Sequence, residues 1–156
     1  MAEESNYYSK ISSRTKLLEE DFISKEFLDD IKDADIIILP HIEKRDAFCS
    51  FPEYTIDFID VLSDDFEGTV EVATDDSNFE PLQIHDIDLI VPIMWIAENI
   101  LVPVVVDKII NWMRQNNSDS VNVELYKEKN GEIKSFKYKG NSEGLEKAGK
   151  LFDKHF

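Results

Sequence analysis

The first regular apolar pattern of the chain runs through TKLLEEDFISKEFLDDIKDA, residues 15–34. Its apolar residues recur every three or four positions between charged ones, which predicts an amphipathic helix. The polar residues 1–14 before it are expected to be a flexible lead to one globular domain over 15–156. The β-branched run IIIL then predicts a strand over 35–39, buried on both faces and stopped by Pro40.

The next segments predict a loop, a helix and a second strand. HIEKRDAFCS, residues 41–50, has the composition of a loop. A helix is expected over 53–63, with Ile56, Ile59 and Leu62 facing inward. The alternating TVEVA predicts a strand over 69–73. A strand, a helix and a strand in this order favour a parallel pair joined by a helical crossover.

The most apolar stretch of the chain, residues 88–113, raises the question of a membrane span. A spanning helix needs about 20 consecutive apolar residues. The longest uncharged run here, residues 89–97, is too short, because Glu98 and Asp107 interrupt the stretch. The pattern instead predicts two buried helices, over 87–99 and 103–116. Both are nearly apolar on all sides, which is typical of central packing elements.

The end of the chain predicts a hairpin and a closing helix. Asn130-Gly131 is the strongest short hairpin signal and separates alternating segments at 121–128 and 133–139. Asn141 or Ser142 is expected to cap the last helix. The inner stripe of that helix is expected to contain Leu145, Ala148, Leu151 and Phe152.

These elements predict an α/β (α+β) fold with one small mixed sheet of about four strands. The C-terminal β-hairpin belongs to this sheet, and helices cover it. The strands expected in the sheet are 35–39, 69–73, 121–128 and 133–139.

Charge is distributed unevenly along the 156 residues, whose formal net charge is −16. Residues 1–90 contain 24 acidic and 7 basic side chains, whereas residues 91–156 contain 9 and 10. An acidic field repels nucleic-acid phosphates and attracts basic partners. Direct nucleic-acid binding is therefore not expected. Acidity also keeps proteins soluble, and composition alone does not separate this role from binding.

Two sets of residues are candidates for chemistry, and neither forms a specific motif. His41, Asp46 and Cys49 share one segment after a strand, but the glycines that usually expose a nucleophile are missing, and a lone cysteine is commonly a packing residue. His85, Asp86 and Asp88 offer metal ligands, but Asp86 also suits a helix N-cap. We predict no catalytic residues, no metal site and no cofactor.

The acidic surface remains the candidate binding site, and a protein with a basic surface is the expected partner. The acids expected to be exposed together follow the first predicted helix and surround the second. They are Glu19, Glu20, Asp29, Asp30, Asp57, Asp60, Asp64 and Asp65.

Residues 103–152, PVVVDKIINWMRQNNSDSVNVELYKEKNGEIKSFKYKGNSEGLEKAGKLF, resemble the effector-associated constant-component domains of bacterial conflict systems. The shared layout is an apolar helix, a hairpin with a polar-glycine turn, and a last helix, although this chain is poorer in glycine. The resemblance implies a non-catalytic module beside a separate effector and identifies no site residues.

The missing catalytic motif and the uneven charge predict a cytoplasmic, non-enzymatic protein-binding module, and the resemblance implies an accessory or regulatory component of a bacterial or phage conflict system. One alternative is an inhibitor that mimics DNA and blocks a nucleic-acid enzyme. A second alternative is a carboxylate-dependent metal hydrolase.

Overall fold

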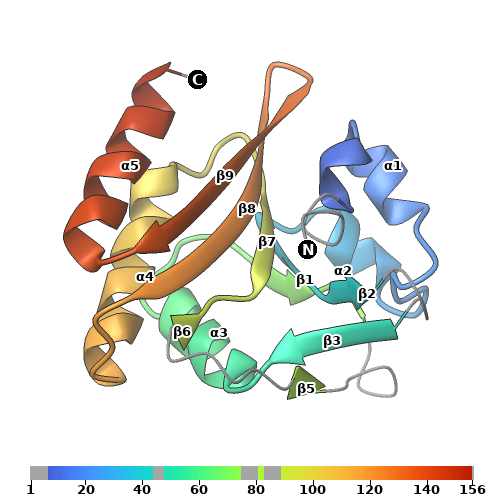
Figure 1. The fold of residues 1–156 in the computed structure, drawn as a ribbon. Helices are drawn as coiled ribbons and strands as arrows, with labels where there is room; N and C mark the ends of the chain where they lie inside the picture. The colour runs from blue at the N-terminus through green and yellow to red at the C-terminus, as the bar shows by residue number, and fades with distance from the viewer. Residues whose placement is uncertain (1–6, 44–47, 75–80, 83–88, 156) are drawn as a thin grey trace.

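A six-stranded mixed sheet forms the centre of the computed structural model, which describes residues 7–43, 48–74, 81–82 and 89–155. Its strands follow the order β4-β1-β7-β8-β6, and β9 pairs with β8 (Figure 1). They are β1 (Ile36–Leu39), β4 (Val70–Val72), β6 (Leu89–Ile90), β7 (Ile93–Ile96), β8 (Val121–Lys129) and β9 (Glu132–Gly140).

Two crossover units meet in the middle of this sheet. Helix α3 (Thr55–Ser63) lies between the parallel strands β1 and β4, and α4 (Val102–Gln115) lies between the parallel strands β7 and β8. Strands β1 and β7 run antiparallel, with Ile37 opposite Trp95. The predicted parallel pair and its helical crossover are therefore confirmed. All four strands expected to share one sheet do so, but the sheet has more strands than the four predicted.

The two unpredicted strands of the main sheet are β6 and β7, and a second, separate sheet of three short strands was not predicted either. Its strands are β2 (His41–Glu43), β3 (Phe48–Pro52) and β5 (Pro81–Leu82). The segment expected to be a loop is thus an antiparallel pair, β2 with β3, and β3 pairs in parallel with β5. These residues form strands because their backbone pairs with a neighbouring strand. The local composition, which is typical of a loop, does not encode that pairing.

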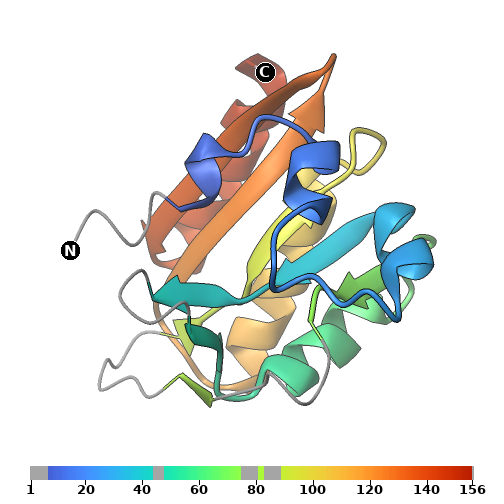
Figure 2. The same cartoon turned by 90° about the vertical axis from the view of Figure 1, so that its right-hand side faces the viewer.

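Helices cover both faces of the main sheet. Helix α3, helix α4 and helix α5 (Ser142–His155) lie on one face, and the N-terminal segment lies on the other (Figure 2). The N-terminal layer contains η2 (Tyr8–Lys10), α1 (Arg14–Leu18) and α2 (Leu28–Lys32). Tyr8 and Ile11 are buried in it, so the expectation of a flexible lead is wrong for residues 7–14.

The helix predicted over 15–34 is two short helices joined by turns. After α1, successive backbone bonds join residues three apart, such as Glu20 N to Leu17 O. The Ser24 amide then donates to the Ala73 carbonyl just after β4, at 2.8 Å. A continuous helix would use that amide internally. Tertiary pairing therefore overrides the helical spacing of the apolar residues.

The first of the two predicted apolar helices is wrong. Residues 89–96 form β6 and β7, which both pair with β8, and β7 is buried along its whole length. Pro92 falls between the two strands, where it interrupts the ladder. A short apolar run suits a strand covered on both faces as well as a buried helix, and here the strand is the outcome.

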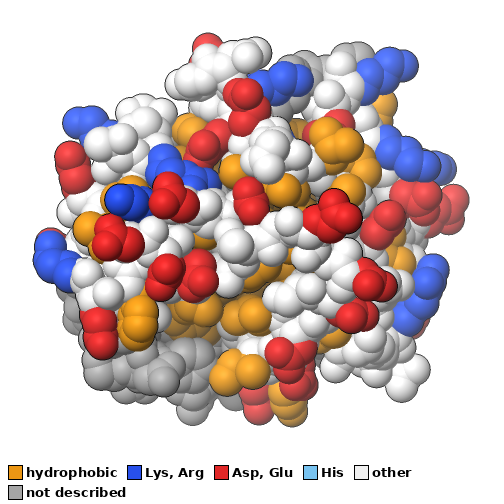
Figure 3. Space-filling model, turned by 180° about the vertical axis from the view of Figure 1, so that it is seen from behind, with side chains coloured by type: hydrophobic (Ala, Val, Ile, Leu, Met, Phe, Trp, Pro, Cys, Tyr) orange, Lys and Arg blue, Asp and Glu red, His pale blue; other side chains and the backbone are white. Residues whose placement is uncertain are grey.

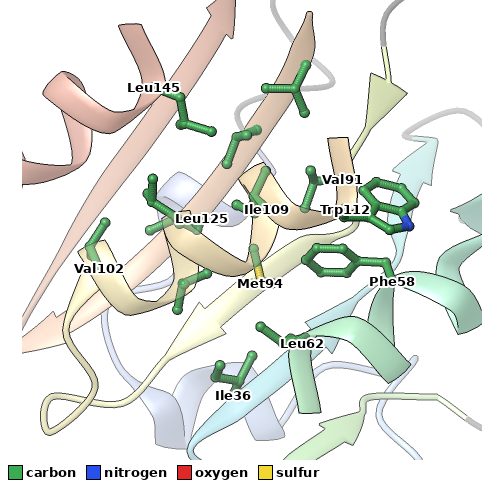
Figure 4. Close-up of a cluster of buried hydrophobic side chains, with 14 of the residues drawn as sticks. Ile36, Phe58, Leu62, Val91, Met94, Val102, Ile109, Trp112, Leu125 and Leu145 are labelled. Atoms are coloured by element: carbon green, nitrogen blue, oxygen red, sulfur yellow. The ribbon is translucent and has the colours of Figure 1, made fainter. Parts of the chain in front are cut away.

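The second predicted apolar helix is confirmed as α4, with Pro103 in its first turn. It is amphipathic rather than buried all round, because Val104 and Asp107 are exposed. On its inner face Trp112 meets Phe58 of α3 with ring centroids 4.9 Å apart, next to the sheet residue Met94 (Figure 4).

The hairpin and the closing helix follow the sequence closely. Asn130 and Gly131 have φ angles of 53° and 79°, as the tight turn requires. The Asn141 side chain accepts a hydrogen bond from the Gly144 amide at 2.9 Å and caps α5. Leu145, Ala148 and Phe152 pack on the core.

Two inward-facing predictions on the helices are wrong. Leu151 of α5 is 56% exposed, and Ile56 of α3 is 69% exposed. Helix α3 buries Thr55, Phe58 and Leu62 instead. The contact between Phe58 and Trp112 fixes which face of α3 turns inward, and the helical period then places Ile56 outward.

Candidate functional site

The eight candidate acids lie in two groups on opposite faces of the main sheet. One group belongs to the N-terminal layer: Glu19 and Glu20 follow α1, and Asp29 and Asp30 are in the first turn of α2. The other group belongs to α3 and its end: Asp57, Asp60, Asp64 and Asp65. All are exposed except Glu20, which is half-buried.

The edge strand β4 separates these two groups. Helix α2 packs against β4 from the N-terminal layer, and the half-buried Val70 and Val72 of β4 pack into the core beside α3. Figure 3 shows the side of the molecule that is hidden in Figure 1, and acidic side chains are spread over this side between apolar patches. The acids of α2 and those at the end of α3 therefore lie on either side of one sheet edge.

Two local features offset the unfavourable position of the acids at the C-terminus of α3. Carboxylates at a helix C-terminus oppose the macrodipole. The Lys108 amine, from α4, donates a hydrogen bond to the backbone carbonyl of Asp64. Asp65 has a φ of 54°, a left-handed conformation that Asp and Asn adopt more readily than most residues. Asp65 thus helps to end the helix in addition to contributing charge.

Glu71, which sequence reasoning missed, brings a further carboxylate to the edge. It is the central residue of β4 and is opposite Ile37, whose side chain is buried in the N-terminal layer. The Glu71 side chain therefore lies on the α2 face of the sheet. Desolvation raises the pKa of its carboxyl group, and the nearby Asp30 raises it further. The alternation of TVEVA was the only sequence signal that placed this acid on one face.

Two of the candidate acids already have partners within the chain. Glu20 accepts a hydrogen bond from the Tyr7 hydroxyl. Asp29 pairs with Lys32 at 3.3 Å, but the Asp29 side chain is almost fully exposed and that of Lys32 about half exposed. Such an exposed pair contributes little to stability and can exchange with another cation.

His41 and Cys49 lie on neighbouring strands rather than in one loop. His41 of β2 is opposite Ser50 of β3, and Cys49 is opposite Ile42. Burial lowers the pKa of His41 to about 4, so its imidazole is neutral near pH 7. Its Nε2 is buried without a hydrogen-bond partner among the described residues. Asp46 and the side chain of Cys49 lie outside the description.

The proposed metal ligands His85, Asp86 and Asp88 also lie outside the described residues, as does the predicted helix cap at Asp86. Within the described ranges, no group of three or more His, Cys, Asp or Glu side chains is placed to hold a metal ion.

Lys127 is a buried charged side chain, a feature often found at functional sites, but here its contacts are structural. It is only 3% exposed and continues the buried positions of Val121, Val123 and Leu125 along β8. Its amine donates to the carbonyls of Ala97, Glu98 and Ile100, and so fixes the loop between β7 and α4. Desolvation lowers the pKa of Lys127, and the three carbonyl acceptors replace the water that it lost.

A groove of about 420 Å³ lies between the η2 segment and the turn of the hairpin. Its lining includes Ser9, Ser12 and Ser135 together with Tyr126, whose hydroxyl donates to Glu124. Desolvation and the neighbouring Glu124 raise the pKa of Tyr126, so this phenol stays protonated. The groove is a polar depression at the β8–β9 side of the sheet, across the molecule from β4.

Among the described residues, no helix is both long and apolar enough to cross a membrane. Comparison with protein-family models, curated proteins and solved structures gave no match.

Proposed function

We propose that this protein is a non-catalytic binding module whose acidic surface docks a protein partner with a basic surface. The observation that carries the proposal is the placement of Asp29 and Asp30 on one side of β4, with Asp64 and Asp65 on the other. Carboxylates near one another repel, and a basic partner relieves this repulsion while gaining a faster encounter.

The burial at this surface supports binding over a purely solubilising role. Glu71 is half-buried on the α2 side of β4, in a position where its charged form is disfavoured. Solubility needs exposed charge and gains nothing from a desolvated carboxyl group. A lysine or arginine of a partner would stabilise the ionised form of Glu71.

The wider setting of this proposal is a cytoplasmic accessory or regulatory component of a bacterial or phage conflict system. Its support is the resemblance of residues 103–152 to effector-associated constant-component domains. The effector would then be a separate protein, and this chain would supply contacts rather than chemistry.

The experiment is a comparative affinity capture from the native host, with the intact chain as bait and quantitative mass spectrometry as readout. The test variant carries Asp29→Asn, Asp30→Asn, Asp64→Asn and Asp65→Asn. Asparagine keeps the size of each side chain and tolerates the left-handed backbone at position 65. A charge-matched control variant carries Asp107→Asn, Asp119→Asn, Glu143→Gln and Glu146→Gln, all exposed positions outside the β4 surroundings.

We expect a basic protein that the original chain and the control variant capture and that the test variant loses. Raising the salt concentration should release it as well, because salt screens exposed charges. Equal capture by all three baits would contradict the proposal. A captured nucleic-acid enzyme that this chain inhibits would instead favour the DNA-mimic alternative.

A further inference from the structure

The outer edge of β4 is open within the described residues. Among the described strands, β4 pairs with β1 alone. The Ile36 amide donates to the Thr69 carbonyl, and the Ala73 amide donates to the Ile38 carbonyl. Because bonding residues alternate in a parallel ladder, the amides and carbonyls of Val70 and Val72 point away from β1. Such a row of backbone groups is a template for one more strand.

The side chains around this edge define the charge of the strand that fits it. Glu71 lies between Val70 and Val72 and projects toward α2, where Asp30 is close enough to affect its ionisation. Two basic side chains beside the flanking acids have partners within the chain: Lys32 pairs with Asp29, and Lys108 donates to the Asp64 carbonyl. A positive residue opposite Glu71 gains a favourable cross-strand pair, and an acidic residue there is repelled.

A second copy of this chain fits the edge less well. Pairing β4 with β4 of another copy would bring together two Glu71 side chains and two sets of flanking acids. Within the described part of the chain β9 forms the opposite edge and carries lysines, but Lys137 is opposite Glu124 within the hairpin and stabilises the charge of that carboxylate. The net charge of −16 also opposes association of two copies.

We propose that an extended segment of the partner protein adds to the sheet at β4, with a lysine or arginine opposite Glu71 and apolar residues opposite Val70 and Val72. The inference rests on the proposed function and specifies how the partner docks. Backbone hydrogen bonds to Val70 and Val72 provide the affinity, and the basic residue provides the selectivity.

The test uses the intact chain and a short synthetic peptide of alternating valine and lysine, observed by NMR at low salt. One control peptide has glutamate in place of lysine. A second control keeps the valine and lysine side chains but is N-methylated along the whole backbone, so it cannot donate to β4. The readouts are the dissociation constant and the hydrogen exchange of the Val70 and Val72 amides.

We expect the lysine peptide to slow exchange of both amides by about tenfold, and the glutamate and N-methylated peptides to leave them unchanged. The variant Glu71→Lys should reverse the preference and select the glutamate peptide. Its folding is checked by the chemical shifts of the core.

Three results would overturn the strand addition. If the N-methylated peptide binds as tightly as the lysine peptide, the surface attracts charge without extending the sheet, and the proposed function survives. If the lysine peptide does not bind, strand addition fails, and the affinity capture separately decides the proposed function. If hydrogen exchange of the Val70 and Val72 amides slows as the protein concentration rises in the absence of peptide, the occupant is a second copy.

Discussion

Arg14 and Glu128, which are 114 positions apart in the sequence, form an ion pair of 2.7 Å between α1 and the end of β8. The same Glu128 oxygen accepts a hydrogen bond from the Trp95 indole at 2.5 Å. Arg14 also donates to the carbonyls of Lys32 and Ala34. This group of side chains fastens the N-terminal layer to the sheet, and it therefore holds the α2 acids beside β4.

The variant Glu128→Gln should lower the free energy of unfolding by about 2 kcal/mol, because it removes a charge-assisted bond and leaves the guanidinium partly buried without a counter-charge. The side chains of Arg14 and Glu128 are only 18% and 24% exposed, so solvent compensates little. Urea unfolding measures the effect.

The matched control is Asp29→Asn, which breaks the exposed pair with Lys32. Its cost should stay below about 0.5 kcal/mol. Equal losses for the two variants would show that the Arg14–Glu128 pair does not fasten the N-terminal layer.

His41 should make stability depend on pH below neutrality. Its folded pKa is about 4, below the unfolded value of 6.5, so in this interval the unfolded chain binds a proton that the folded chain excludes. The associated stability is complete above the unfolded pKa and is lost as the pH falls toward the folded one. Between about pH 7 and about pH 5, the loss attributable to His41 is about 2 kcal/mol.

The variant His41→Leu isolates this contribution from that of the carboxylates. Urea unfolding at both pH values should show a smaller loss of stability in the variant than in the original chain. Identical pH dependence in the two proteins would mean that His41 is accessible to protons in the folded state.

Gly131→Ala should destabilise the protein by about 1 kcal/mol, because φ is +79° and a side chain there is strained. An added Cβ would meet no atom within 4 Å, so the cost is conformational and not steric. The control is Asn130→Gly. Asn130 also has a left-handed φ, of 53°, which glycine adopts without strain, so this variant should not destabilise the protein. Thermal unfolding distinguishes the two, and an unchanged melting temperature for Gly131→Ala would contradict the assignment of the turn.

Sequence patterns predicted the elements whose local signals and tertiary surroundings agree. Asn130-Gly131 defined the hairpin, Pro103 marked the first turn of α4 and Asn141 capped α5, because each residue acts on backbone within a few positions. The pattern failed at residues 89–96. A short run that is apolar at every position has no helical or strand periodicity, so the sequence could not distinguish a buried strand from a buried helix. It failed again at Ser24, whose amide bonds to Ala73, a contact between distant parts of the chain.

The candidate acids were readable from the sequence, but their arrangement was not. Composition placed eight acids around two predicted helices, whereas only the topology shows that α2 and α3 lie on either side of β4. Glu71 was missed because a glutamate in an alternating strand is usually solvent-facing. The sequence did not predict the burial of Lys127, because its three carbonyl partners lie in a loop about 30 positions earlier.

The most direct test of the central claim is the dissociation constant of the captured partner, measured by calorimetry at low salt for the original chain, the four-site variant and its charge-matched control. Melting temperatures confirm that each protein is folded. We expect the variant at Asp29, Asp30, Asp64 and Asp65 to bind at least about tenfold more weakly, and the control to bind within about threefold of the original chain. Equal weakening in both would show that only net charge matters, and unchanged binding in both would place the interface elsewhere; either result would contradict an acidic docking surface around β4.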